Sequence, residues 1–172
     1  SPDWNRYALL TVWDGMRDAR RFLESSRFMS LYRSHADRSS TLLLRTLRAH
    51  GKWNGANPFL PSEESSKHSD RICVLTRATI RPGRLREFWE MVEPVGQALA
   101  EADGLRGSIG IGELPFIRQA TVSIWESEEK MRAFAYSAGV HRTVVGRTRD
   151  EAWYSEDLFA RFRIIEESGT FP

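Results

Sequence analysis

The order of elements that the sequence predicts after residue 71 limits the fold more than any other feature of this chain. "RICVLTRATI" (71–80) is rich in β-branched residues and predicts a strand. A helical pattern follows "RPG", two strand patterns span 104–125, and a second helical pattern begins at "ESEEKMRAFAYS" (126–137). "WYSEDLFARFRII" supplies a last strand. The order β, helix, β, β, helix, β is typical of a ferredoxin-like α+β fold, which has an antiparallel sheet with helices on one face.

The part of the chain before this unit predicts a partial second copy of it. A strand pattern at 6–14 precedes a helical pattern at 16–34, and "STLLLRTLRA" (40–49) fits a strand or a helix, of which we favour the strand. At an offset of 112 residues, "TVWD" (11–14) aligns with "SIWE" (123–126). We interpret this match as two tandem ferredoxin-like repeats that form an α+β barrel.

This interpretation divides the chain into three parts. Residues 1–50 are a first repeat that is truncated at its N-terminus, because its opening strand and helix have no counterpart. Residues 51–70 are rich in Gly, Asn, Pro and Ser and predict a linker loop. Residues 71–172 are the second repeat.

Composition excludes several classes of protein. The 172 residues carry 25 basic and 23 acidic side chains, with no isolated basic block, which argues against a nucleic-acid partner. No apolar run approaches the roughly 20 residues that a membrane span needs. Cys73 is the single cysteine, so an intrachain disulfide is impossible. This cysteine usage fits a reducing compartment, and we expect a cytoplasmic protein.

His141 is the main candidate for a metal ligand. In a helix over 137–149, His141 shares one face with Val144, Val145 and Thr148. One interpretation is a core histidine that is satisfied by a hydrogen bond. The other is an iron ligand, because zinc needs three or four protein ligands whereas haem needs only one. His35, His50 and His68 fall in or near loops and are expected at the surface.

The strands of the second repeat carry the other candidates. Gly107, Gly110 and Gly112 lie in one strand, where they mark either close approach of a ligand or a β-bulge. Arg77 is a charge within a strand, which indicates either a contact to ligand or bound oxygen or an exposed edge position. Gln119 and Trp125 share a strand face. Gln119 is a possible polar anchor in a pocket, and Trp125 is a pocket wall or a core residue.

Several segments together resemble the spheroidene monooxygenase family. They are "GKWNGANPF", "LTRATIRPGRLREFWEMV", "IGIGELPFIRQATVSIW", "MRAFAYSAGVHRTVV" and "EAWYSEDLFARF", in this order along the chain. The resemblance implies a haem-dependent oxygenase that uses dioxygen and an external electron donor to oxidise an acyclic carotenoid to a ketone. It also implies membership of the dimeric α+β barrel group, in whose haem-degrading branch a helical histidine is the axial ligand.

With this resemblance, the sequence predicts a haem b enzyme. His141 matches the axial iron ligand, and Trp125 and Val145 are expected to contact the cofactor. Arg77 and Gln119 are the expected catalytic polar groups. The expected partners are a small or hydrophobic substrate, an electron donor and a second copy of the chain. Two alternatives stay open, namely a haem-dependent dehydratase or rearrangement enzyme on a nitrogen-containing substrate, and a barrel that binds haem or a hydrophobic ligand without catalysis.

Overall fold

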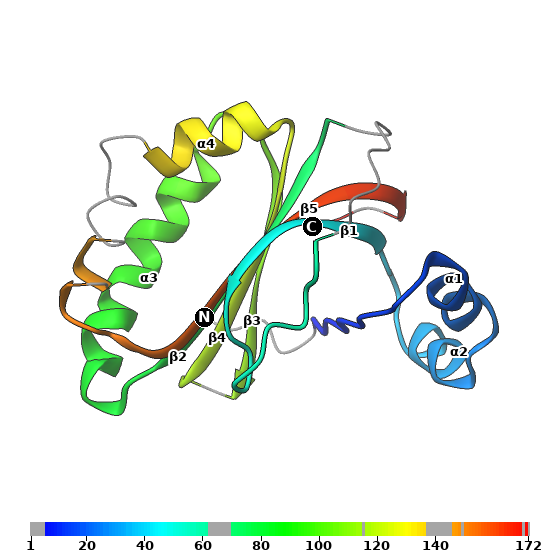
Figure 1. Ribbon diagram of the computed structural model, residues 1–172, viewed down its shortest axis with the longest axis horizontal. Coiled ribbons are helices and arrows are strands. Elements are labelled where there is room, and N and C mark those ends of the chain that lie inside the picture. The colour runs from blue at the N-terminus through cyan, green and yellow to red at the C-terminus, as the bar shows by residue number, and fades with distance from the viewer. Residues whose placement is uncertain are drawn as a thin grey trace.

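Five antiparallel strands form one sheet in the order β1-β5-β2-β4-β3 (Figure 1). The computed structural model of the chain describes residues 6–61, 70–114, 116–136, 146–148, 150–169 and 171. The strands are β1 (Thr41–Gly51), β2 (Ile72–Ile80), β3 (Leu105–Leu114), β4 (Arg118–Trp125) and β5 (Tyr154–Ser168). The helices are α1 (Met16–Ser25), α2 (Arg27–Ser34), α3 (Leu85–Ala100) and α4 (Glu128–Tyr136), and a 3₁₀ turn spans Pro82–Arg84.

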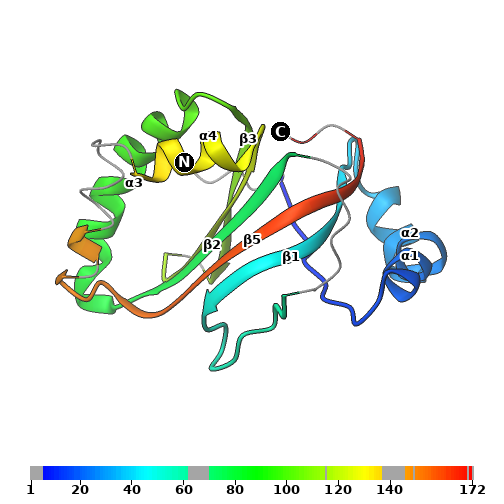
Figure 2. The ribbon, with the colours of Figure 1, turned by 45° about the horizontal axis from the view of Figure 1, so that its top comes forward.

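The predicted ferredoxin-like unit is confirmed. The elements β2, α3, β3, β4, α4 and β5 follow one another in the expected order. Their strands lie side by side as β5-β2-β4-β3, and α3 and α4 lie on the same side of the sheet (Figures 1 and 2). The fold class is therefore α+β with an antiparallel sheet.

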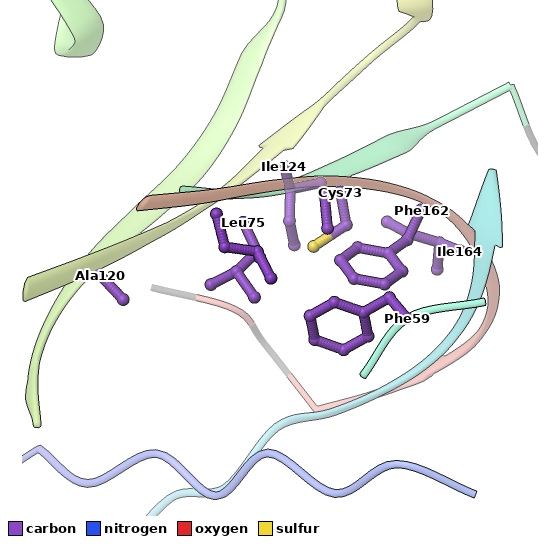
Figure 3. Packing of buried hydrophobic residues seen from close by; sticks show 9 residues of the cluster. Phe59, Cys73, Leu75, Ala120, Ile124, Phe162 and Ile164 are labelled. Atoms are coloured by element: carbon purple, nitrogen blue, oxygen red, sulfur yellow. The ribbon is translucent and has the colours of Figure 1, made fainter. Parts of the chain in front are cut away.

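Alternate residues of β2 enter two different cores. Ile72 and Val74 pack on the helix side against residues such as Met131 of α4. Cys73 and Leu75 pack on the opposite side, in a cluster that includes Phe59 (Figure 3). The central strand is thus buried on both faces. We call the two sides the helix face and the outer face of the sheet.

The first part of the chain differs from the prediction. The strand expected at 6–14 is wrong, because residues 6–13 find no hydrogen-bonded strand among the described residues. The helix expected over 16–34 is broken at Ser26, whose backbone is extended and whose Oγ accepts a hydrogen bond from the Phe28 N–H at 3.2 Å. Ser26 thereby becomes the N-cap of α2.

The strand expected at 40–49 forms as β1, and it joins the sheet of the second part through β5. The described strands therefore form a single sheet, and the tandem repeat and the division at 51–70 stay predictions.

Pro94 lies inside α3, yet the helix continues without interruption from Leu85 to Ala100. The cost of the lost N–H is offset in part by packing of Leu99 on the sheet. The loop expected after β1 is present, and over 52–61 its one strand-like feature is a bridge between Trp53 and Ala56. No helix in the described part of the chain has the length and apolarity needed to cross a membrane.

Candidate functional site

A cross-strand row runs over the middle of the sheet on its helix face. Thr76 of β2 pairs with Thr121 of β4 on one side and with Phe159 of β5 on the other. Thr121 pairs in turn with Gly110 of β3, and Phe159 pairs with His50 of β1. Directly paired residues of antiparallel strands share a face. The next row contains Gln119 opposite Gly112. We call Thr76, Gly110, Gly112, Gln119 and Thr121 the floor.

The floor is open although it lies under the helix layer. Thr76 is exposed at the centre of β2, whereas Val74 and Ala78 on the same face of this strand are buried. Gly110 and Gly112 are exposed as well. A central position of a central strand is normally covered, so exposure there indicates a hollow above the floor.

Helix α3 forms the other side of the hollow. None of its 16 residues is buried, although the helix carries an apolar face. Leu99 of this face packs on the sheet, and Val95, Met91 and Phe88 follow it at helical spacing on the same side. These three side chains are partly buried. The apolar side of α3 and the small side chains of the floor are the groups that a flat apolar ligand between them would contact.

The three glycines of β3 differ in what they do. Register shifts flank Gly107 on one side and Gly112 on the other, which fits the β-bulge interpretation at these two positions. Gly110 is paired regularly, and a Cβ added there would meet no atom within 4 Å. Gly110 thus has no local structural need for glycine, which fits close approach of a ligand.

Gln119 lies in the floor, as expected for a polar anchor. A Cβ added at Gly112 would lie 3.8 Å from both amide atoms of Gln119, so the amide extends over this glycine. Trp125 lies on the same face but is fully buried in the core between sheet and helices. Its Nε1 donates a hydrogen bond to Ser123 Oγ at 3.0 Å, and its ring packs on Phe134. Its role as a cofactor contact stays a prediction.

Arg77 is not part of this hollow. It pairs with Ala120, which belongs to the outer core, so Arg77 and Gln119 extend from opposite faces of the sheet. Arg77 is 1% exposed and lies in a central strand. The interpretation of Arg77 as an exposed edge residue is therefore wrong, whereas its catalytic role stays a prediction.

The Arg77 guanidinium is enclosed by two carboxylates and an indole. Its Nε and Nη2 donate to Glu113 at 3.1 and 2.8 Å, and its Nη1 donates to Glu156 at 2.7 Å. Its Cζ lies 4.8 Å from the centre of the Trp53 ring. Burial alone would lower the pKa of Arg77, but the hydrogen bonds to the two glutamates outweigh burial and raise it. Arg77 therefore stays charged.

The loop after β1 closes this network. Backbone N–H groups of Asn54 and Gly55 donate to the Glu156 carboxylate at 2.9 and 2.7 Å. Both residues have positive φ, which Asn and Gly adopt more readily than other residues. These bonds hold the pKa of Glu156 below its usual value. The Asn-Gly pair in "GKWNGANPF" signals the turn, but the sequence does not reveal its partner.

An arginine pair adjoins the floor. Arg48 of β1 lies directly opposite Arg161 of β5, one pair beyond the His50–Phe159 pair on the same face. Like charges at this spacing are unfavourable unless an anion is near. Arg161 donates to Glu128 of α4 at 2.5 Å, but its Nε is buried and has no hydrogen-bond partner among the described residues. This orphaned donor fits a carboxylate of a bound ligand.

His50 lies at the β1 end of the cross-strand row. Its ring stacks on Phe159, with centroids 5.2 Å apart and planes inclined by 28°. His50 is exposed, as expected, but it also ends the cross-strand row of Thr76. His141 and Val145, and with them the predicted metal ligand, lie outside the described residues. Arg147, which is described, ion-pairs with Glu151 and lies over Trp153.

Comparison with known proteins gives relatives over nearly the whole chain. A spheroidene monooxygenase of Rhodobacter capsulatus is 36% identical over 171 residues, which are 99% of this chain and 71% of the relative. The spheroidene monooxygenase of Cereibacter sphaeroides is 35% identical over 98% of this chain and 52% of the relative. No family model matches the chain.

Among solved structures, a proposed monooxygenase of Fusobacterium nucleatum superposes with a TM-score of 0.55 at 9% identity, covering 89% of this chain and 65% of that chain. This likeness supports the fold alone. The sequence relatives decide the family, because their similarity extends over 98–99% of this chain. The chain belongs to the spheroidene monooxygenase family.

Proposed function

We propose that this chain carries the haem site of a monooxygenase that oxidises a long, apolar polyene. The observation that carries this proposal is the open floor at Thr76 and Gly110 beneath α3. Membership of a family whose relatives are named spheroidene monooxygenases supports the substrate class. An acyclic carotenoid would then be the substrate, and its ketone the product.

The described residues fit a flat macrocycle with acidic edges. Gly110 and Gly112 leave room at the floor, and the apolar side of α3 faces them. Arg161, with its unpartnered Nε, and the neighbouring Arg48 would hold the propionate carboxylates. His141 is the proposed iron ligand. When bound, the haem would supply the iron that activates dioxygen, with electrons from an external donor.

The chain's own residues would bind and orient the substrate. Val95, Met91 and Phe88 offer apolar contacts along α3 for a polyene. The Gln119 amide can donate a hydrogen bond at the floor and so fix which substrate carbon lies near the reactive centre. The buried strand residues on either side of Thr76 exclude water from below. The arrangement therefore favours oxidation of one position of an extended apolar molecule.

Haem titration of three histidine variants tests the proposal. Purified chain is titrated with haemin, and the Soret band is recorded for wild type, His141→Ala, His50→Ala and His35→Ala. We expect one haem per chain, with the band shifted or lost in His141→Ala alone. His35 is the matched control, because it lies at the end of α2 and its Nδ1 contacts Leu31 O at 2.9 Å. Loss of the band in His50→Ala instead would move the ligand to β1, and no band in any variant would overturn the haem proposal.

A turnover assay then separates the reaction types. Oxidation of an acyclic carotenoid that requires dioxygen and a reductant is the expected result. Turnover of a nitrogen-containing substrate without reductant would instead identify a dehydratase.

A further inference from the structure

The first described segment and helices α1 and α2 expose an unusual number of large apolar side chains. Of the twelve large hydrophobic residues that are exposed in the described part of the chain, seven lie here: Tyr7, Leu9, Leu10, Val12, Trp13, Phe28 and Leu31. Tyr7 is 78% exposed, Leu31 59% and Phe28 50%. An apolar surface of this kind marks an interaction site when it is contiguous.

Ring contacts make the surface contiguous across three segments. Trp13 lies 5.1 Å from Phe22 of α1, Phe22 lies 6.5 Å from Phe28 of α2, and Phe28 lies 5.9 Å from Tyr32, measured between ring centroids. In α2, Phe28 and Leu31 are three residues apart and lie on the same exposed side. We call this surface the aromatic surface: the exposed residues of 6–13 together with Phe28, Leu31 and Tyr32.

The helix pair α1 and α2, which carries Phe28, Leu31 and Tyr32 of the aromatic surface, stands away from the sheet. In Figures 1 and 2, α1 and α2 lie beside the start of β1, on the side of the molecule opposite α3 and α4, and the blue segment 6–13 runs from α1 back toward the sheet. Arg20 of α1 forms an ion pair with Glu166 near the end of β5, which ties the unit to the sheet. An external membrane or protein can therefore contact α1 and α2 without disturbing the hydrophobic core.

The same unit is basic. Residues 6–38 contain seven arginines against four acidic residues, giving a charge of +3, whereas the chain as a whole carries +2. The remainder of the chain is therefore slightly acidic. Arg17 and Arg21 lie on the exposed side of α1, away from buried Ala19. Arginine flanking exposed aromatic and leucine side chains is the pattern of helices that lie in the interface of an anionic bilayer.

We propose that the aromatic surface docks the protein on an anionic lipid membrane. Charge favours this occupant over a second copy of the chain, because a symmetric contact would bring each arginine-rich unit against its like. Anionic lipids instead complement the arginines while the aromatic side chains enter the headgroup region. The proposal goes beyond the proposed function and does not depend on it. Docking would place the protein at the lipid bilayer, which is where an apolar polyene dissolves.

Vesicle co-sedimentation tests the docking without haem or substrate. The 172-residue chain is mixed with vesicles of phosphatidylcholine and phosphatidylglycerol, or of phosphatidylcholine alone. We expect binding to the anionic vesicles that falls with salt, and much weaker binding to the neutral ones. The double variant Arg17→Gln/Arg21→Gln should bind about 30-fold more weakly, since each arginine near such a surface contributes about fivefold. Phe28→Ser/Leu31→Ser should lose binding as well.

The controls alter equally exposed residues elsewhere. Leu60 is 81% exposed in the loop after β1, and Arg86 lies on the exposed side of α3. Leu60→Ser/Arg86→Gln should bind like wild type. A dye on Leu31→Cys reports insertion, because Cys73 is buried and will not compete for the label. Equal binding of both vesicle types, or no effect of the arginine variant, would overturn the proposal. The proposal would also be overturned if the chain did not bind vesicles but formed a dimer that Phe28→Ser dissociates, because a second copy would then occupy the surface.

Discussion

At the scale of single residues, the main electrostatic feature of the outer face of the sheet is the buried charge of Arg77. Removing a buried cation from water costs several kcal/mol, and two carboxylates with good geometry are needed to offset this cost. Glu113 accepts two hydrogen bonds from Arg77, and Glu156 accepts two further hydrogen bonds from backbone N–H groups of the loop. Glu156 therefore links the central strand β2 to the loop, although 79 residues separate it from Arg77.

Substitution of Glu156 should destabilise the protein in a pH-dependent way. The pKa of Glu156 is lowered by the N–H groups of Gly55 and Asn54 and by Arg77, from an ordinary value of 4.5. A carboxylate with a lowered folded-state pKa contributes stability above its unfolded-state pKa and loses it as pH falls through the folded-state pKa. Glu156→Gln should thus lower the free energy of unfolding by about 2 kcal/mol at neutral pH. The difference should shrink below about pH 4.5.

Urea unfolding of wild type and variant from pH 7 to pH 3 measures this difference. The matched control is Glu126→Gln, because Glu126 pairs with Arg106 at 2.9 Å but both side chains are at least half exposed. Its effect on the free energy of unfolding should be small, because an exposed ion pair contributes little. If the difference in free energy of unfolding between wild type and Glu156→Gln stayed constant from pH 7 to pH 3, the negative charge of Glu156 would not be the source of its stabilising effect.

At the scale of elements, β3 carries a glycine that the strand itself does not require. Gly110 is regularly paired, has no positive φ and has open space where a Cβ would be. A β-branched residue there should therefore favour the strand, and Gly110→Val should raise the free energy of unfolding by about 0.5–1 kcal/mol. The same variant should weaken haem binding at least tenfold, because the added methyl groups extend into the hollow.

The two effects have opposite signs, which makes the measurement decisive. Gly96→Ala is the control, since Gly96 lies in α3 with open space at its Cβ and should gain about 1 kcal/mol in stability without changing haem affinity. Destabilisation by Gly110→Val would instead mean that the strand itself needs this glycine. Unchanged haem affinity would remove Gly110 from the floor of the site.

The elements after residue 71 could be predicted because local signals agree with the fold. Period-two and helical patterns alternate there, and turn residues separate them. The segment 6–13 has the composition of a strand as well, but a strand needs a hydrogen-bonded partner, and composition cannot supply one. The break at Ser26 depends on a single cap, and the continuation of α3 through Pro94 depends on packing of its apolar side. Neither is visible in a sequence pattern.

The site was predictable to a smaller extent for the same reason. Alternation along β4 correctly assigned Gln119 and Trp125 to one face. Arg77 could not be assigned, because β2 is apolar on both sides and its pattern does not distinguish the helix face from the outer face. Glu113, Glu156 and Arg161 are ordinary charged residues in sequence, and only the register of the strands brings them to Arg77 or to the floor.

At the scale of the whole molecule, the chain contains one strongly connected body and one weakly attached unit. Hydrogen-bonded ladders join all five strands from β1 at one edge to β3 at the other, and two hydrophobic cores cover the faces of the sheet. Helices α1 and α2 contact each other, and the Arg20–Glu166 ion pair joins them to the sheet. Local stability follows such connections, because a unit with little buried surface opens without unfolding the rest.

Hydrogen exchange should therefore divide the molecule in two. Amides in β2, which is paired on both sides, should exchange only on global unfolding, whereas amides of α1 and α2 should exchange roughly 10³-fold faster or more. Arg20→Gln should speed exchange in α1 and α2 further and leave β2 unchanged. If α1 exchanges as slowly as β2, the unit is an integral part of the folded body. Anionic vesicles should slow exchange in α1 and α2 alone, because membrane contact would order the unit that the sheet leaves weakly held.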